Sequence, residues 1–279
     1  MLLQHLIAFV YLLAGTITDF KKREVSDWAN YGLIAMGLAL NAYLSIVDWD
    51  WRPLAASVVV LCAFWLFGWL MCRAGQWGGG DSKLLMGLGA LYGLDFFLVS
   101  FLVGSLFMGA IYGVAWSMVL AFRHREAFIK RFRGLAEEWK KWRILAFSAL
   151  IASALLWLIW KPLFLFFTFC ALIYLLLYLC MFIKAVEDSC MRKWIPPEKL
   201  TEGDWLAKKV IVSGKVLAGP DDKEGLSKSQ VAKLQELARK GKVKKVYVKE
   251  GIPFVPSFLL GWIAALGIQP GLLFQLLQR

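Results

Sequence analysis

The chain has 279 residues, of which 59% are hydrophobic, and it carries a formal net charge of +12. Soluble globular domains contain about 45–50% apolar residues, so the composition excludes an ordinary soluble protein and indicates a polytopic membrane protein. The basic residues gather between hydrophobic runs, as the positive-inside rule expects, and no nucleic-acid-binding motif is present. We therefore expect a lipid bilayer as partner and no nucleic acid.

The hydrophobic runs predict a mainly α bundle of about eight transmembrane helices, since about 20 apolar residues cross the hydrocarbon. The first run ends in Lys21-Lys22-Arg23, which places that end in the cytoplasm and the N-terminus outside. This first run has no cleavage signature, so it is interpreted as a retained segment. The predicted spans are 2–20, 28–47, 53–72, 84–94, a fifth ending at 122, 144–160, 162–183 and 253–277.

The fourth run, Leu84 to Leu94, is short. A helix that starts at Asp81 would rise only about 20 Å by Leu94. We therefore expect a break near Gly93-Leu94-Asp95, with one longer helix as the alternative.

Between the spans lie two polar regions. Residues 123–143 are basic and place Phe128, Phe132, Leu135 and Trp139 at helical spacing, which favours a lipid-facing amphipathic helix at the cytoplasmic surface over a binding role. Residues 184–252 predict a small cytoplasmic α+β insert, with strands at 209–212 and 244–248 and a helix at 227–240. The predicted regions are a transmembrane part with the candidate site (1–122), the amphipathic segment (123–143), a transmembrane hairpin (144–183), the insert (184–252) and a C-terminal transmembrane helix (253–279).

Two acids carry the candidate chemistry. Asp19 ends the first run and Asp81 begins the fourth, so both are predicted at one depth on the cytoplasmic face. Two adjacent carboxylates share a proton. The ionised one can activate water, and the protonated one can polarise a peptide carbonyl. The pair therefore predicts an aspartic protease.

The alternatives for each acid alone are structural. Asp81 could be an ordinary N-cap after a glycine turn, and Asp19 could pair with Lys22 or Arg23. In the catalytic interpretation, Gly78 and Gly80 leave the backbone bare for an extended substrate. The five cysteines form no CxxC pair and there are only two histidines, so we expect no metal and no cofactor.

Gly78-x-Gly80-Asp81 matches the GxGD signature of the membrane aspartic proteases, and Lys83 completes the GxGDxK form. Asp19 with Lys22-Arg23 and residues 25–28 resembles the first-helix site of the type IV prepilin and archaeal preflagellin peptidases. The resemblance covers mainly residues 15–90. The insert and the segment 251–258 are similar to the archaeal branch.

The resemblance implies a multi-pass enzyme of the cell membrane that cuts the short basic leader from pilin-like or archaellin precursors at the cytoplasmic face. Glu24 and Asp27 are cytoplasmic acids that could attract such a leader, as are Glu187 and Asp188. Pro253 and Pro256 could shape the substrate site or simply start a helix. The absence of paired CxxC motifs favours a peptidase without methyltransferase activity.

Two other classes of function remain open from the residues. A transporter or channel could use the same acids to bind a cation, although transport carboxylates lie near the bilayer midplane. A membrane scaffold whose insert binds a partner would need neither acid.

Overall fold

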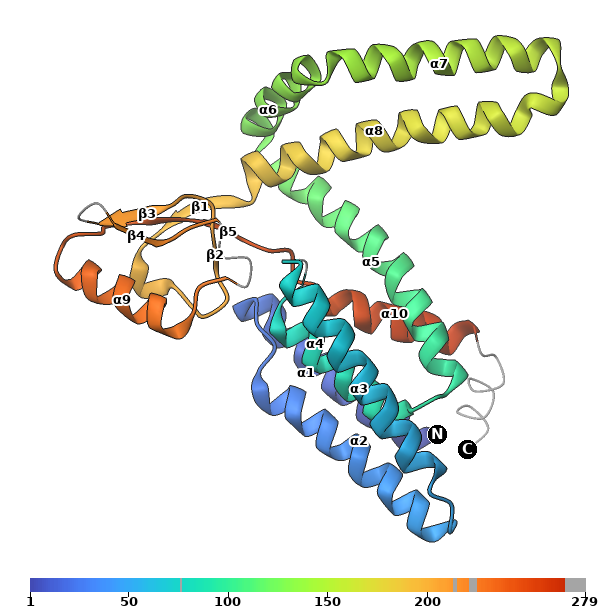
Figure 1. Cartoon of the computed structure of the whole chain (residues 1–279), viewed down its shortest axis with the longest axis vertical. Coiled ribbons are helices and arrows are strands. Elements are labelled where there is room, and N and C mark those ends of the chain that lie inside the picture. Colours follow the sequence, from blue (N-terminus) through green and yellow to red (C-terminus); the bar gives the residue numbers. More distant parts are fainter. Residues whose placement is uncertain (76, 213–214, 221–224, 269–279) are drawn as a thin grey trace. The chain divides into compact units, whose positions relative to one another are not determined.

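The computed structural model describes residues 1–75, 77–212, 215–220 and 225–268 (Figure 1). The chain divides into two compact units. One comprises Met1–Gly113 and Lys193–Arg279, and the other comprises Val114–Arg192. The predicted end of the last span, after residue 268, lies outside the described residues.

Among the described residues, six helical segments are long and apolar enough to cross a membrane, which makes the chain a polytopic helical membrane protein. The predicted spans agree with them except at the ends, and α8 continues to Cys190 where we expected an end at Ile183. Two more apolar helices, α4 and α10, are shorter. The six segments are α1 (Leu2–Lys22), α2 (Asp27–Val47), α3 (Arg52–Arg73), α5 (Phe96–Arg123), α7 (Lys140–Ile159) and the run of η1 (Lys161–Leu163) with α8 (Phe164–Cys190).

Helix α4 (Gly79–Tyr92) packs against both α2 and α3 in the first unit. Glycines permit this close approach. A Cβ atom on Gly37 of α2 would lie 2.6 Å from the backbone nitrogen of Leu91, and one on Gly89 of α4 would lie 2.6 Å from the ring of Phe64. Small residues of this kind let membrane helices pack backbone to backbone.

Helix α4 ends at Gly93, whose φ of +59° favours glycine, so the predicted break is confirmed. Its 14 residues span about 21 Å, which is less than the hydrocarbon thickness of about 30 Å. The last carbonyls of a helix have no partner within it. In a bilayer each unpaired backbone group costs several kcal/mol.

Side chains from three neighbouring helices donate to two of these carbonyls. The amide of Asn41 on α2 donates to the carbonyls of Ala90 (2.9 Å) and Leu91 (3.1 Å). The hydroxyl of Ser57 on α3 also donates to Ala90, and the amide of Gln4 on α1 donates to Leu91 (3.0 Å). Side chains of neighbouring helices thus supply donors at the end of the short helix.

Helix α10 (Val255–Ile268) closes the bundle against α1. The indole of Trp262 on α10 donates to the hydroxyl of Tyr92 (3.0 Å), which also bonds Nδ1 of His5 on α1 (3.0 Å). The buried core of the first unit joins residues of α1, α2, α3, α4, α5 and α10, among them Leu12, Leu33, Val60, Leu88, Phe97, Phe101 and Phe258.

The residues between α8 and α10 form a small α+β part. Strands β1 (Arg192–Ile195), β5 (Val246–Lys249) and β2 (Trp205–Leu206) form one sheet in the order β1-β5-β2, and β3 (Val210–Val212) pairs with β4 (Lys215–Ala218). Helix α9 (Lys228–Arg239) begins with a capping box between Ser227 and Gln230. A short turn, η2 (Pro197–Lys199), follows β1. The predicted helix and both predicted strands are present, and β1, β2 and β4 were not predicted.

Helix α6 (Arg125–Glu138) lies in the second unit. Leu135 is fully buried and the ring of Phe128 contacts Phe182 of α8 at 5.5 Å. Leu135 is therefore enclosed within the protein, whereas the lipid contact expected for the rest of this apolar face stays a prediction.

The bonds that terminate α4 generate a stability prediction. Asn41→Leu and Ser57→Ala should each lower the free energy of unfolding by about 1–3 kcal/mol, because each leaves a buried carbonyl with fewer donors. Thermal unfolding of the detergent-solubilised protein measures this change. Ser100→Ala is the control, because its hydroxyl bonds only Phe96 of its own helix. Equal losses in all three variants would contradict the argument.

Candidate active site

Asp19 lies on the last turn of α1 and is 5% exposed. Its Oδ2 atom accepts a hydrogen bond from the backbone N–H of Val255 (2.9 Å), and the backbone of Phe254 provides a second bond. Val255 is the first residue of α10. The first N–H groups of a helix have no partner within the helix and attract an anion. The carboxylate of Asp19 is thus held at the N-terminus of α10.

Arg23, one turn beyond Asp19, also acts on that carboxylate through its charge. Its Nε atom forms an ion pair with Glu250 (3.7 Å), in the segment that leads into α10. The predicted alternative, in which Arg23 pairs with Asp19, therefore accounts for one of the charges that act on the Asp19 carboxylate. It does not replace the bonds from α10.

Asp81 is the third residue of α4, and the helix N-cap is Gly78. The expectation that Asp81 begins the helix was therefore wrong by two residues, and the alternative that it caps the helix was wrong by three. Its half-buried carboxylate accepts a hydrogen bond from the backbone of Gly78. The carboxylate also interacts electrostatically with that of Asp19, so the structure brings the two predicted acids into one site.

Close packing at Gly15, one turn before Asp19, shows how the three helices meet. A Cβ atom on Gly15 would lie 3.3 Å from a methyl group of Val255 on α10 and 3.5 Å from one of Leu84 on α4. Leu84 follows Asp81 by less than one turn. Helices α1, α4 and α10 therefore converge at the level of both acids.

The three glycines before Asp81 have different surroundings. A Cβ atom on Gly80 would lie 3.3 Å from the backbone nitrogen of Val25, whereas one on Gly79 would have no neighbour within 4 Å. One on Gly78 would approach only the carboxylate of Asp81, at 3.6 Å. Gly80 thus permits packing on the segment between α1 and α2, and Gly78 and Gly79 present open backbone.

Trp77, the residue before these glycines, anchors the loop. Its ring contacts Phe67 of α3 at 5.4 Å, and it contacts Phe254 and Phe258 at 5.5 and 6.0 Å. The glycine loop and the entry to α10 are therefore held together by aromatic packing.

Lys83 and Asp27 are joined by an ion pair of 3.0 Å, with the Lys83 amine also 4.8 Å from the centre of the Tyr31 ring. Lys83 therefore links α4 to the start of α2. The charge of Asp27 is compensated by it, whereas Glu24 is exposed at the end of the preceding turn.

Pro253 and Pro256 are both buried, and they flank the two residues that donate to Asp19. Pro256 is the second residue of α10, where a proline is tolerated because that position needs no intrahelical donor. Sequence reasoning missed Phe254 and Val255, since a backbone N–H leaves no side-chain signal. The two prolines around them were the available hint.

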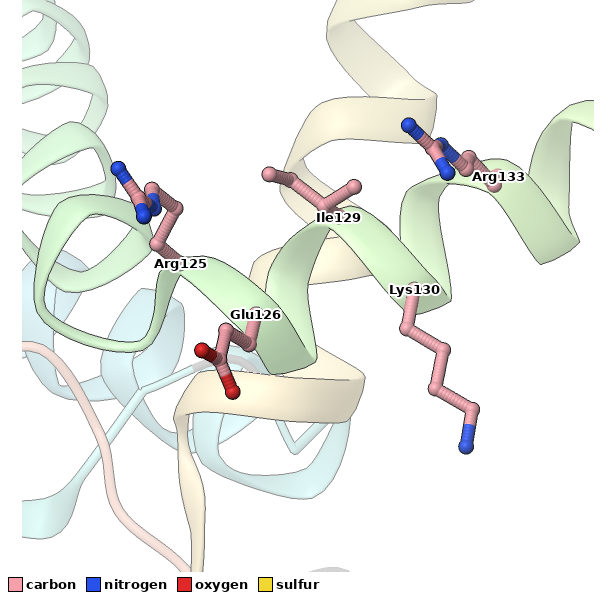
Figure 2. Close-up of a pocket in the computed structure, with 5 residues that line it drawn as sticks. All are labelled: Arg125, Glu126, Ile129, Lys130 and Arg133. Carbon is pink, nitrogen blue, oxygen red and sulfur yellow. The ribbon is translucent and has the colours of Figure 1, made fainter.

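A separate shallow depression lies on α6, lined by Arg125, Glu126, Ile129, Lys130 and Arg133 (Figure 2). It contains neither acid, so it does not belong to the candidate site. Within the described ranges, no cluster of three or more His, Cys, Asp or Glu side chains could hold a metal ion.

Residues 6–114 match the Type IV leader peptidase family. A preflagellin peptidase of Methanocaldococcus jannaschii is 36% identical over 90 residues, which cover 32% of this chain and 38% of the relative. A preflagellin peptidase of Methanococcus voltae is 34% identical over 90 residues, which also cover 32% of this chain and 38% of the relative. The prepilin leader peptidase/N-methyltransferase of Escherichia coli is 30% identical over 101 residues, or 35% of this chain and 44% of the relative. The chain thus spans less than half the length of these relatives. No solved structure gives a significant match.

The bond from α10 to Asp19 generates the second prediction. Val255→Pro removes the N–H donor at a position where proline suits a helix start, and Val255→Ala keeps the donor while shortening the side chain. Relative to Val255→Ala, the proline variant should lose about 1.5–3 kcal/mol of stability, the range for a hydrogen bond to a charged group. In an Asp19→Ala background the difference should disappear. An equal difference in both backgrounds, measured by thermal unfolding, would show that the bond contributes nothing.

Proposed function

Because residues 6–114 match the type IV leader peptidase family, we propose that the protein is a membrane aspartic endopeptidase that removes the short basic leader from pilin-like or archaellin precursors. The observation that carries the proposal is the convergence of Asp19 and Asp81 from different helices. The names of the aligned relatives, preflagellin peptidase and prepilin leader peptidase/N-methyltransferase, support the same class of substrate.

The surroundings assign different roles to the two acids. Asp19 accepts bonds from two backbone N–H groups and lies near the charge of Arg23, whereas Asp81 has the backbone of Gly78 and faces the negative charge of Asp19. In the proposed pair, the proton therefore resides mainly on Asp81. Ionised Asp19 removes a proton from the attacking water, and protonated Asp81 donates a hydrogen bond to the scissile carbonyl oxygen.

Open backbone beside Asp81 supports the binding of an extended peptide. Nothing would contact a side chain at Gly79 within 4 Å, so a substrate strand can approach the backbone there. Glu24 is exposed close to Asp19 in the chain and provides negative charge for a basic leader. Asp27, already paired with Lys83, contributes less to this attraction.

We propose that both acids lie at the cytoplasmic face and that the N-terminus is outside. Lys21, Lys22 and Arg23 follow Asp19 directly, which supports this orientation. Asp19 is three residues from the end of α1, and Asp81 is the third residue of α4. These end positions favour a surface protease over a transporter, whose carboxylates lie near the midplane. The small α+β part would then be cytoplasmic, and α4 and α10 would complete a bundle of about eight membrane helices.

The roles of the acids generate the third prediction. Asp19→Asn and Asp81→Asn should each reduce cleavage of a pilin-like or archaellin precursor by at least about 100-fold, because each removes a general acid or base. Cleavage in detergent or reconstituted membranes measures this, with thermal unfolding as a check on folding. Asp50→Asn, in the turn before α3, is the matched control and should retain full activity. Full activity of either site variant in a folded protein would refute the assignment.

The fourth prediction separates the two glycines. Gly79→Val should lower kcat/KM about tenfold or more without lowering the unfolding midpoint, because its side chain enters the open space through which substrate approaches. Gly80→Ala should instead lower the unfolding midpoint, since its methyl group meets the backbone of Val25 at 3.3 Å. If one of the two variants had both the lower kcat/KM and the lower unfolding midpoint, the assignment of Gly79 to open space and of Gly80 to a packed contact would be contradicted.

A further inference from the structure

The three-stranded sheet β1-β5-β2 has two chemically different faces. On β5, Val246 and Val248 are buried and pack with Leu234 of α9. The alternating residues Tyr247 and Lys249 are only half-buried, as expected for an antiparallel sheet with one covered face. Helix α9 therefore covers one side, and the other side is free of it (Figure 1).

On the free side, aromatic rings alternate with lysines. The rings of Trp194 and Tyr247 lie 4.9 Å apart, and the amine of Lys208 lies 5.6 and 5.2 Å from their centres. On the neighbouring strand pair, the amine of Lys249 lies 6.0 Å from the centre of the Trp205 ring, and these two residues are direct cross-strand partners. We call these five residues the aromatic–basic face.

The face remains accessible in the described part of the chain. Trp194 is 54% exposed, and Lys208 is exposed beside it. Tryptophan and tyrosine with adjacent lysines are the side chains that proteins place at the headgroup level of a bilayer. There the rings meet the acyl boundary, and the amines attract anionic phosphates.

Covalent connections hold this sheet close to membrane helices at two points. Trp194 follows the end of α8 at Cys190 by four residues, which reach at most about 14 Å in extended chain. Lys249 precedes the start of α10 at Val255 by six residues, or at most about 21 Å. Since β1 and β5 are neighbours in one sheet, the two tethers attach to adjacent strands of the aromatic–basic face.

We propose that the aromatic–basic face binds the anionic phospholipid headgroups of the membrane in which the chain is inserted. Its positive amines complement the lipid phosphates. The two tethers keep the sheet within reach of the bilayer surface. This binding goes beyond the proposed peptidase activity and does not depend on it.

The test uses the full chain reconstituted in nanodiscs of phosphatidylcholine alone or with phosphatidylglycerol. Acetylation of individual lysines by a water-soluble reagent is followed by mass spectrometry. Lys208 and Lys249 should react about fivefold more slowly in the anionic discs, the factor expected for the attraction of one lysine to an anionic leaflet. High salt should remove much of this protection. Lys233, exposed on α9, is the internal control and should react equally in both discs.

Variants test whether the aromatic rings are needed to protect the lysines of this face from acetylation. Trp194→Ala should abolish the protection of Lys208, whereas Trp49→Ala, at a residue 95% exposed between α2 and α3, should leave it intact. Equal reactivity of Lys208 and Lys249 in both kinds of disc would overturn the proposal, as would equal protection of Lys233. Protection by single-stranded RNA but not by anionic discs would overturn it in favour of a nucleic acid. If Trp194→Ala does not fold, the comparison of lysines in the unmodified protein still decides the question.

Discussion

The early end of α4 is the constraint on which the rest of the first unit depends. The last carbonyls of a helix have no partner within it, and where they are buried among other helices they need donors from those helices. Asn41, Ser57 and Gln4 supply them from three other helices. These bonds anchor one end of α4, and Asp81 lies in the first turn at the other. The acid is therefore positioned by contacts made at the far end of its own helix.

The other acid depends on α10 in a complementary way. A buried carboxylate needs hydrogen bonds to offset the loss of water, and the N-terminus of α10 provides them at Val255 and Phe254. The prolines at 253 and 256 shape this helix start, and Trp77 packs the glycine loop against it. One helix N-terminus thus satisfies Asp19 and supports the loop that leads into α4 and Asp81.

The acidic side chains of this site could be predicted from the sequence, whereas the backbone N–H groups that bond to Asp19 could not. Asp19 and Asp81 stand out as acids at the ends of apolar runs, and Gly93 marks the break by its conformational freedom. The donors at Val255 belong to the main chain and lie 236 positions from Asp19, so no local pattern reports them. Strand β2 has only two residues, too few for a periodic signal. The apolar side of α6 was assigned to lipid because periodicity shows which face is apolar and not what covers it.

The hydrogen bond between Asp19 and Val255 also has a consequence for biosynthesis. Asp19 leaves the ribosome 236 positions before its partner Val255, and both polar segments and all intervening spans are made in between. Until α10 is inserted, the carboxylate of Asp19 lacks its two backbone donors and Trp77 lacks its contacts with Phe254 and Phe258. The proposed pair of acids is therefore complete only once α10 has been made and inserted.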